Sequence, residues 1–287
     1  MVHGAVWLHE RCRRALCPPT LASSQSMARR ASPREHSTEQ RPLWNLGWRW
    51  LPGREACADE ALVEACVALY SEHYGAWGQS GPRPGEPIRN SSSYLRALLD
   101  DEAAWIACAF SDDDLVGYCI SIRLELPGKG RIASVTQLVV NSSYRKVRVA
   151  TTLLYGIWQF SDCYAWGLVT ANQFAVRALE TATRRQCRAA LIASKGAPVL
   201  AEVAKHVRYL PSAMVEETDG NRGPRVNTEF FVDHSDIPSM LRKAARGERP
   251  WGLGRVDEGE EWVACTFADQ PPAAMGRPAV GRASDGG

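Results

Sequence analysis

The sequence lacks several features that would assign it to a special class of protein. Its formal net charge is only +2 over 287 residues, without the strong basic excess of a dedicated nucleic-acid binder. Its longest apolar run, residues 103–110, is too short to span a bilayer. The N-terminal region shows no apolar core of signal-peptide length followed by a small-residue cleavage site. We therefore expect a cytoplasmic protein that binds neither nucleic acid nor membrane.

The nine cysteines form no Cys-x-x-Cys pair, and their number is odd. Cys108, Cys119, Cys163 and Cys187 fall inside predicted strands or helices, which indicates buried thiols in a reducing compartment. A disulfide framework and a metal site are therefore not expected. Neither Cys163 nor Cys187 has an adjacent His–Asp set, so the sequence gives little support to nucleophilic catalysis.

The chain divides into three parts by composition. Residues 1–42 are rich in Arg, Ser and Pro without an apolar period, which predicts a disordered basic leader. Met27 offers a later start, and Glu10, Glu35 and Glu39 weaken an organelle-targeting interpretation. Residues 43–235 are predicted to form one domain. Residues 236–287 are predicted to be a C-terminal extension that is disordered from about residue 271.

Hydrophobic periodicity predicts an alternation of strands and helices within the domain. The expected strands are 44–50, 105–110, 115–126, 132–141, 167–170, 189–193 and 226–232. The expected helices are 59–74, 92–100, 151–164, 172–185 and 199–209. This order predicts an α/β fold, in which a mixed sheet carries helices on both faces.

Residues 132–185 are the most informative stretch. An apolar strand runs into a basic turn, the turn opens a helix, and a second short strand runs into a second helix. Such a helix start points backbone N–H groups at an anion, beside a strand end along which a ligand can lie. The arrangement is typical of a protein that holds a pyrophosphate-bearing cofactor without a metal.

These residues resemble the GNAT superfamily of acyl-CoA-dependent N-acyltransferases. The family's pyrophosphate turn reads Gln/Arg-x-x-Gly-x-Gly/Ala, and the matching residues here are Arg145, Lys146, Val147, Arg148, Val149 and Ala150. Arg145 and Ala150 fit the pattern, whereas Arg148 stands where the family usually has Gly. Asn172, Ala175 and Val176 match the family's Asn-x-x-Ala-Ile/Val helix start. The resemblance implies the GNAT fold, a mostly antiparallel mixed central sheet with a splayed parallel strand pair.

The resemblance also implies binding of acetyl-CoA or another acyl-CoA. The turn from Arg145 to Ala150 is expected to bind the pyrophosphate, with a solvated basic turn as the alternative. Arg148 is expected to point outward and contact a phosphate without adopting a positive φ. Backbone N–H groups of Leu138 and Val140 are implied to bind the pantetheine and polarise the thioester carbonyl. Asn172 is implied to contact the cofactor, or to be only a helix cap.

The catalytic acid and base are less clearly marked. Candidates for the general base are Glu125, at the end of the third strand, and, after it, His73, at the end of the first helix; an ordinary surface group is the favoured interpretation of each. Leu179 stands where many family members carry the Tyr that protonates the departing thiolate. Tyr164 and Tyr209 are possible substitutes, with structural packing as the alternative for both.

The resemblance predicts an N-acyltransferase that moves an acyl group, by preference acetyl, from acyl-CoA to an amine by direct attack in a ternary complex. The loop at residues 75–90, entered by Tyr74 and Trp77, is implied to form part of the acceptor site. One alternative is an enzyme that takes the acyl group from an acyl carrier protein. Such a donor presents a single phosphopantetheine phosphate, so the enzyme would tolerate a pyrophosphate turn that departs from the family pattern. Another is a non-catalytic GNAT-fold module that senses CoA or binds a partner. The acceptor and the oligomeric state stay open.

Overall fold

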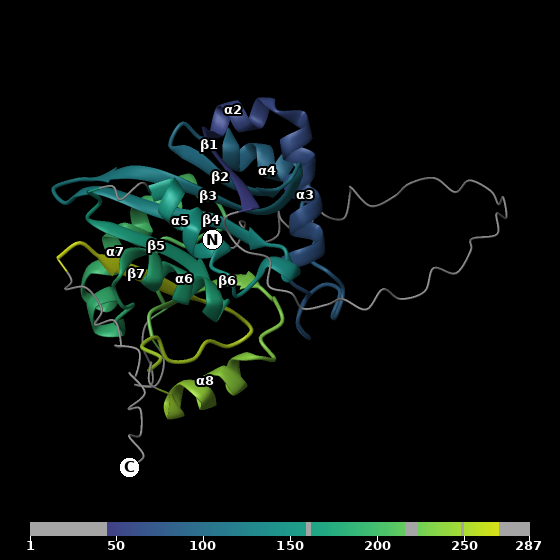
Figure 1. Ribbon diagram of the computed structural model, residues 1–287. Coiled ribbons are helices and arrows are strands. Elements are labelled where there is room, and N and C mark those ends of the chain that lie inside the picture. The colour runs from purple at the N-terminus through teal and green to yellow at the C-terminus, as the bar shows by residue number, and fades with distance from the viewer. Residues whose placement is uncertain (1–44, 159–161, 216–222, 248–249, 270–287) are drawn as a thin grey trace, which may run out of the picture.

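The computed structural model describes residues 45–158, 162–215, 223–247 and 250–269. The predictions for residues 1–42 and for the region from 271 lie outside the described residues. Within them, one sheet runs through the molecule in the order β1-β2-β3-β4-β5-β7-β6 (Figure 1). The strands are β1 (Leu46–Pro52), β2 (Ala104–Ser111), β3 (Asp114–Leu126), β4 (Gly130–Val140), β5 (Ala165–Thr170), β6 (Arg225–Phe230) and β7 (Gly259–Phe267).

Every neighbouring pair of strands is antiparallel except β4 and β5, which are parallel. The helices are α2 (Gly53–Ala58), α3 (Glu60–His73), α4 (Ser92–Leu99), α5 (Val149–Trp158), α6 (Gln173–Thr183), α7 (Ala189–His206) and α8 (Ile237–Arg246), with a 3₁₀ turn η2 (Ser142–Tyr144). The predicted mixed α/β sheet with a parallel pair is confirmed.

Alternate residues of β3 divide the helices between the two faces of the sheet. A Cβ on Gly117 would lie 3.1 Å from Val149 of α5, so this side of the sheet carries α5. The next residue, Tyr118, belongs to the cluster that α3 and α4 bury on the opposite face. Ile122 of β3 faces the same side as Tyr118, because the two lie an even number of residues apart, and it pairs with Ser134 of β4. Val199 of α7 lines a small apolar cavity together with Ser134. Helix α7 therefore lies on the α3 face. Both faces are therefore covered by helices.

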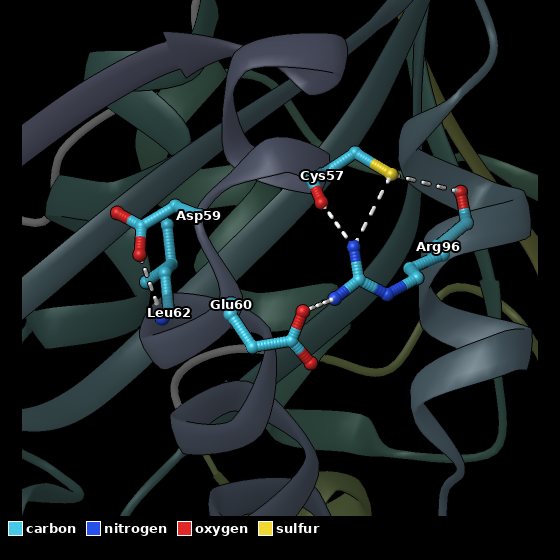
Figure 2. Close-up of polar contacts among 5 residues, drawn as sticks. All are labelled: Cys57, Asp59, Glu60, Leu62 and Arg96. Carbon is cyan, nitrogen blue, oxygen red and sulfur yellow. Dashed lines mark hydrogen bonds and ion pairs between the residues drawn. The ribbon is translucent and has the colours of Figure 1, made fainter.

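Helix α3 forms as its sequence predicts. Asp59 caps it by accepting a hydrogen bond from the Leu62 amide at 3.1 Å. Arg96 of α4 then ties the three helices of this layer together, as Figure 2 shows: its guanidinium donates to the Cys57 carbonyl of α2 and to the Glu60 carboxylate of α3. The clamp fixes the direction of α3, whose C-terminal residue His73 contacts the turn after β4.

The prediction of a strand at 189–193 is wrong, because these residues begin α7. The buried residues of α7, Ile192, Val199, Leu200 and Val203, recur at helical spacing. A short apolar run does not distinguish a strand from a buried helical turn, which is why the pattern misled. None of the helices in the described part of the chain is long and apolar enough to cross a bilayer.

The sheet extends past the boundary expected at residue 235. Strand β7, which falls in the expected C-terminal extension, pairs with β5 on one side and β6 on the other. Its Trp262 and Phe267 have no exposed surface. Residues 259–267 are therefore an internal strand of the sheet.

Candidate functional site: a gap between two parallel strands

The parallel strands β4 and β5 part in mid-course. Their pairing begins at Ile132↔Ala165 and ends at Val135↔Leu168. The register of β4 against β3 shifts at the same point, so that Thr136 forms a bulge. Beyond it, the edge of β4 that faces β5 has no partner strand among the described residues. Leu138 and Val140, to which the family resemblance assigns the pantetheine, lie in this open stretch.

A tyrosine closes one side of the gap. The Tyr209 hydroxyl, a few residues after α7, donates a hydrogen bond to the Thr136 carbonyl at 3.1 Å. Burial raises the pKa of Tyr209 well above its usual value, and the neighbouring Tyr94 and Glu261 raise that pKa further. Of the two tyrosines considered as a general acid, Tyr209 lies at the bulge. Tyr164 instead packs against Phe267, with ring centroids 5.7 Å apart, at the other end of β5.

The turn after β4 has the backbone of a glycine-containing turn. Lys146 and Arg148 both adopt left-handed conformations, with φ of 65° and 68°. The expectation that Arg148 avoids a positive φ is therefore wrong. The first hydrogen bond of α5 joins the Thr152 amide to the Arg148 carbonyl at 2.9 Å. The amides of residues 149–151 precede that bond and point out of the helix start.

The side chain of Arg145 is directed at the protein. Its guanidinium donates to the carbonyl of Val140 at 3.2 Å and to the carbonyl of His73. Burial lowers the pKa of Arg145. His73 in turn accepts a hydrogen bond at Nδ1 from the Ser142 amide, with a separation of 3.5 Å. The two predicted site residues thus meet, and they join the end of α3 to the end of β4. Lys146 and Arg148 are exposed and supply the charge outside the turn.

Asn172 caps α6 beside the turn. Its side-chain oxygen accepts from the Phe174 amide at 2.8 Å and from the Ala175 amide at 3.4 Å. Phe174 is 59% exposed, which is unusual for a large apolar residue in this molecule. The helix-cap interpretation accounts for the Asn172 side-chain oxygen. No sequence signal predicts the exposure of Phe174, since an isolated apolar residue in a helix normally faces the core.

Glu125 lies far from the gap. It pairs across the β3–β4 hairpin with Arg131, whose Nε is 3.2 Å from the carboxylate. Arg131 and Leu138 are separated by about 23 Å along β4, at about 3.3 Å per residue. The structure therefore does not bring Glu125 to the place where an acyl group would lie. Leu179, at the position of the missing Tyr, is fully buried.

A carboxyl group that the sequence did not single out lies at the gap. Glu261 of β7 is 5% exposed, just beyond the end of β5. Burial raises its pKa to about 7, although hydrogen bonds from the Thr228 hydroxyl and the Ala171 amide lower it. Tyr74, Tyr94 and Tyr209 are all close enough for Glu261 to raise their pKa values. Sequence reasoning missed Glu261 because β7 fell in the expected extension.

Residues 64–182 match the family model described as the acetyltransferase (GNAT) family. No protein with a curated description matches the chain. Similar solved structures include a ribosomal-protein-alanine N-acetyltransferase from Brucella melitensis, which is 24% identical over 38% of this chain and 67% of that one, with a TM-score of 0.27. Arabidopsis thaliana NAA60 with a bisubstrate analogue is 15% identical over 50% of this chain and 84% of that one, with a TM-score of 0.37.

A third similar structure is an aminoglycoside acetyltransferase from an uncultured soil sample in complex with sisomicin. It is 18% identical over 48% of this chain and 85% of that one, with a TM-score of 0.33. Similarities this weak carry no argument about the acceptor. The family model covers the gap, the left-handed turn and the Asn172 cap, and these are the features that mark the fold. Residues 64–182 therefore resemble a GNAT acetyltransferase domain in sequence and in these features of the fold.

Proposed function

We propose that the protein is an N-acyltransferase that moves an acyl group, acetyl in the simplest case, from acyl-CoA to an amine. The observation that carries this proposal is the continuity of the open β4 edge with the left-handed turn and the start of α5. One extended ligand can then pair with the strand edge at one end and place its phosphates on the helix start at the other.

The acyl-CoA would be held mainly by the backbone. Amide groups of the pantetheine pair with the β4 edge at Leu138 and Val140, where the partner strand is missing. The pyrophosphate lies at the amides of Val149, Ala150 and residue 151, ahead of the first helical hydrogen bond. Lys146 and Arg148 are exposed beside this point and add positive charge.

Transfer would proceed by direct attack of the amine on the thioester carbon. The bulge at Thr136 turns the strand edge toward the acyl group, so that a backbone N–H donates to the carbonyl oxygen as negative charge develops there. Holding both substrates in one site replaces a bimolecular encounter by an intramolecular one. Arg145 acts as a positioning residue, because it holds the end of β4 against the end of α3.

The test is acyl transfer by the purified protein. Acetyl-CoA and longer acyl-CoAs are mixed with a panel of small amines, amino acids and peptides with free N-termini, and acylated products are detected by mass spectrometry. We expect protein-dependent acylation of at least one amine, with release of free CoA thiol. An acetylated carrier protein is run in parallel, and transfer from it alone would contradict acyl-CoA as the donor. A thermal shift with acetyl-CoA but no transfer to any amine would favour a non-catalytic CoA-binding module.

A further inference from the structure

Glu261 lies in surroundings that stabilise a negative charge poorly. Its carboxylate is buried, and the donors that reach it, the Thr228 hydroxyl and the Ala171 amide, are both neutral. No positively charged side chain is among the groups that shift its pKa within the described part of the chain. A buried carboxylate without a cation is costly, and a bound cation offsets that cost. The site is therefore suited to a positively charged ligand.

Aromatic rings gather on the same side of the sheet. Tyr74, at the C-cap of α3, stacks on Tyr70 at 4.2 Å and lies 6.0 Å from Phe230 of β6. Trp77 meets Phe230 edge-on at 5.5 Å. Tyr74, Trp77 and Phe230 are only half-buried, so part of this aromatic wall is accessible. Ring faces attract cations and pack against flat apolar groups.

Tyr209 connects this group to the reaction centre. Its hydroxyl bonds to the Thr136 carbonyl at the bulge, and its pKa is raised by Glu261. The carboxylate thus lies near the side of the gap that Tyr209 closes, on the strand next to β5. It also belongs to the face of α3, α4 and α7, opposite to the face of α5 that presents the phosphate turn. The proposed amine site and the proposed phosphate site therefore lie on opposite faces of the sheet.

We propose that Glu261 binds the ammonium group of the acceptor and removes its proton, and that the acceptor is a primary amine with an apolar or aromatic group next to the nitrogen. This inference rests on the proposed function. The ammonium gives one proton to the Glu261 carboxylate. The neutral amine nitrogen then bonds to the thioester carbon, the C–S bond breaks, and the departing thiolate takes a second proton from that nitrogen. Glu261 releases its proton to solvent after the amide leaves.

The first test uses turnover with the amine that the panel identifies. The ratio kcat/KM should rise with pH through about 7, because Glu261 accepts a proton only when ionised and its pKa in the free protein is about 7. The neighbouring Tyr74, Tyr94 and Tyr209 do not titrate near pH 7, because their pKa values are all raised above 10. Glu261→Gln keeps the shape of the side chain and should lower kcat by about 100-fold or more and abolish this pH step. Thr228→Val removes a hydrogen bond that lowers the Glu261 pKa and should move the step to higher pH.

Two controls separate catalysis from folding. Glu102→Gln alters an exposed carboxylate that pairs with Arg54, and it should leave kcat and the pH profile unchanged. The thermal shift with acetyl-CoA should be equal in wild type and Glu261→Gln, which shows that the variant is folded and binds the donor. A Glu261→Gln protein with wild-type kcat and an unchanged pH profile would overturn the assignment.

The second test needs no turnover. Phenethylamine should raise the melting temperature of the wild-type protein, and 2-phenylethanol, which lacks the charge, should not. Glu261→Gln should abolish the difference between the two probes. Equal responses of the wild type to both probes would overturn the ammonium site. Failure to acylate any amine would overturn the proposed function separately, and the probe comparison would then still decide whether Glu261 binds ammonium.

Discussion

Arg148 shows how a departure from a family pattern can leave the backbone unchanged. The family's Gly is replaced by Arg, yet the residue keeps the left-handed φ of 68°. A non-glycine residue in this region costs about 1–2 kcal/mol, and the neighbouring Lys146 carries a second such cost. The turn therefore retains the shape that exposes the α5 amides, at some expense of stability. Because Arg148 is exposed and adjacent to those amides, its charge remains available to a bound phosphate.

Two substitutions separate the effect of the Arg148 charge on CoA binding from the effect of its backbone strain on stability. Arg148→Gly and Arg148→Ala both remove the guanidinium, but only Gly relieves the left-handed conformation. We expect the Gly variant to be more stable than the Ala variant by about 1 kcal/mol in denaturant unfolding. If the guanidinium contacts a phosphate, both variants should bind CoA more weakly and with a shallower salt dependence than the wild type. Tighter CoA binding by the Gly variant at both of two salt concentrations would show that Arg148 obstructs the turn.

At the scale of single elements, the layer of α2, α3 and α4 determines where the acceptor side of the site lies. The Arg96 clamp in Figure 2 sets α3 against its neighbours, and α3 ends at His73 and Tyr74 beside the gap. Helix α2 reaches this layer only because its first residue is small. A Cβ on Gly53 would lie 2.2 Å from the Leu99 carbonyl of α4 and 2.8 Å from Ala104 of β2. The α4 backbone on one side and the sheet on the other cannot move aside to make room for the added carbon.

Gly53→Ala should accordingly destabilise the fold by about 1–3 kcal/mol, because the added methyl forces α2 away from α4. Gly47→Ala in β1 is the matched control. Its Cβ would meet nothing closer than 3.8 Å, so we expect a change within about 0.5 kcal/mol. Urea unfolding of the two variants measures both values. Equal stabilities would mean that α2 is not packed as closely as described.

Elements with strong local signals were predictable from sequence. The Asp59 cap with its helical spacing gave α3, and the apolar strand followed by a basic turn gave β4 and α5. Long-range placement was not predictable. Whether residues 189–193 form a strand or a helix depends on their packing against β7, and the role of Glu261 depends on β7 lying beside β5. Glu125 illustrates the same limit, since its position in the sequence does not show that the hairpin carries it away from the gap.

The whole molecule is held together by a strand from its C-terminal region. Strand β7 connects β6 to β5 and buries Trp262 and Phe267 completely. It also brings Glu261 to the end of β5, so that the same strand contributes to stability and to the site. The sheet therefore extends to residue 267, past the boundary that composition suggested.

A chain shortened to residues 45–235 should fail to fold, because β5 and β6 lose their common neighbour and the apolar face around Trp262 is exposed. A chain of residues 45–269 should unfold cooperatively. Near-ultraviolet circular dichroism and thermal unfolding of the two chains make this comparison. A cooperative transition in the shorter chain would show that β7 is dispensable.

The central claim is that acyl-CoA lies along the open edge of β4 with its phosphates at the start of α5. Hydrogen–deuterium exchange with and without saturating acetyl-CoA tests it most directly. We predict slower exchange in peptides that cover residues 136–140 and 149–151, because the amides on the β5-facing edge of β4 and the first amides of α5 lack partners. The β3–β4 hairpin at residues 125–131 serves as the internal control and should not change. Protection confined to other parts of the chain, or none under conditions where acetyl-CoA raises the melting temperature, would contradict this placement.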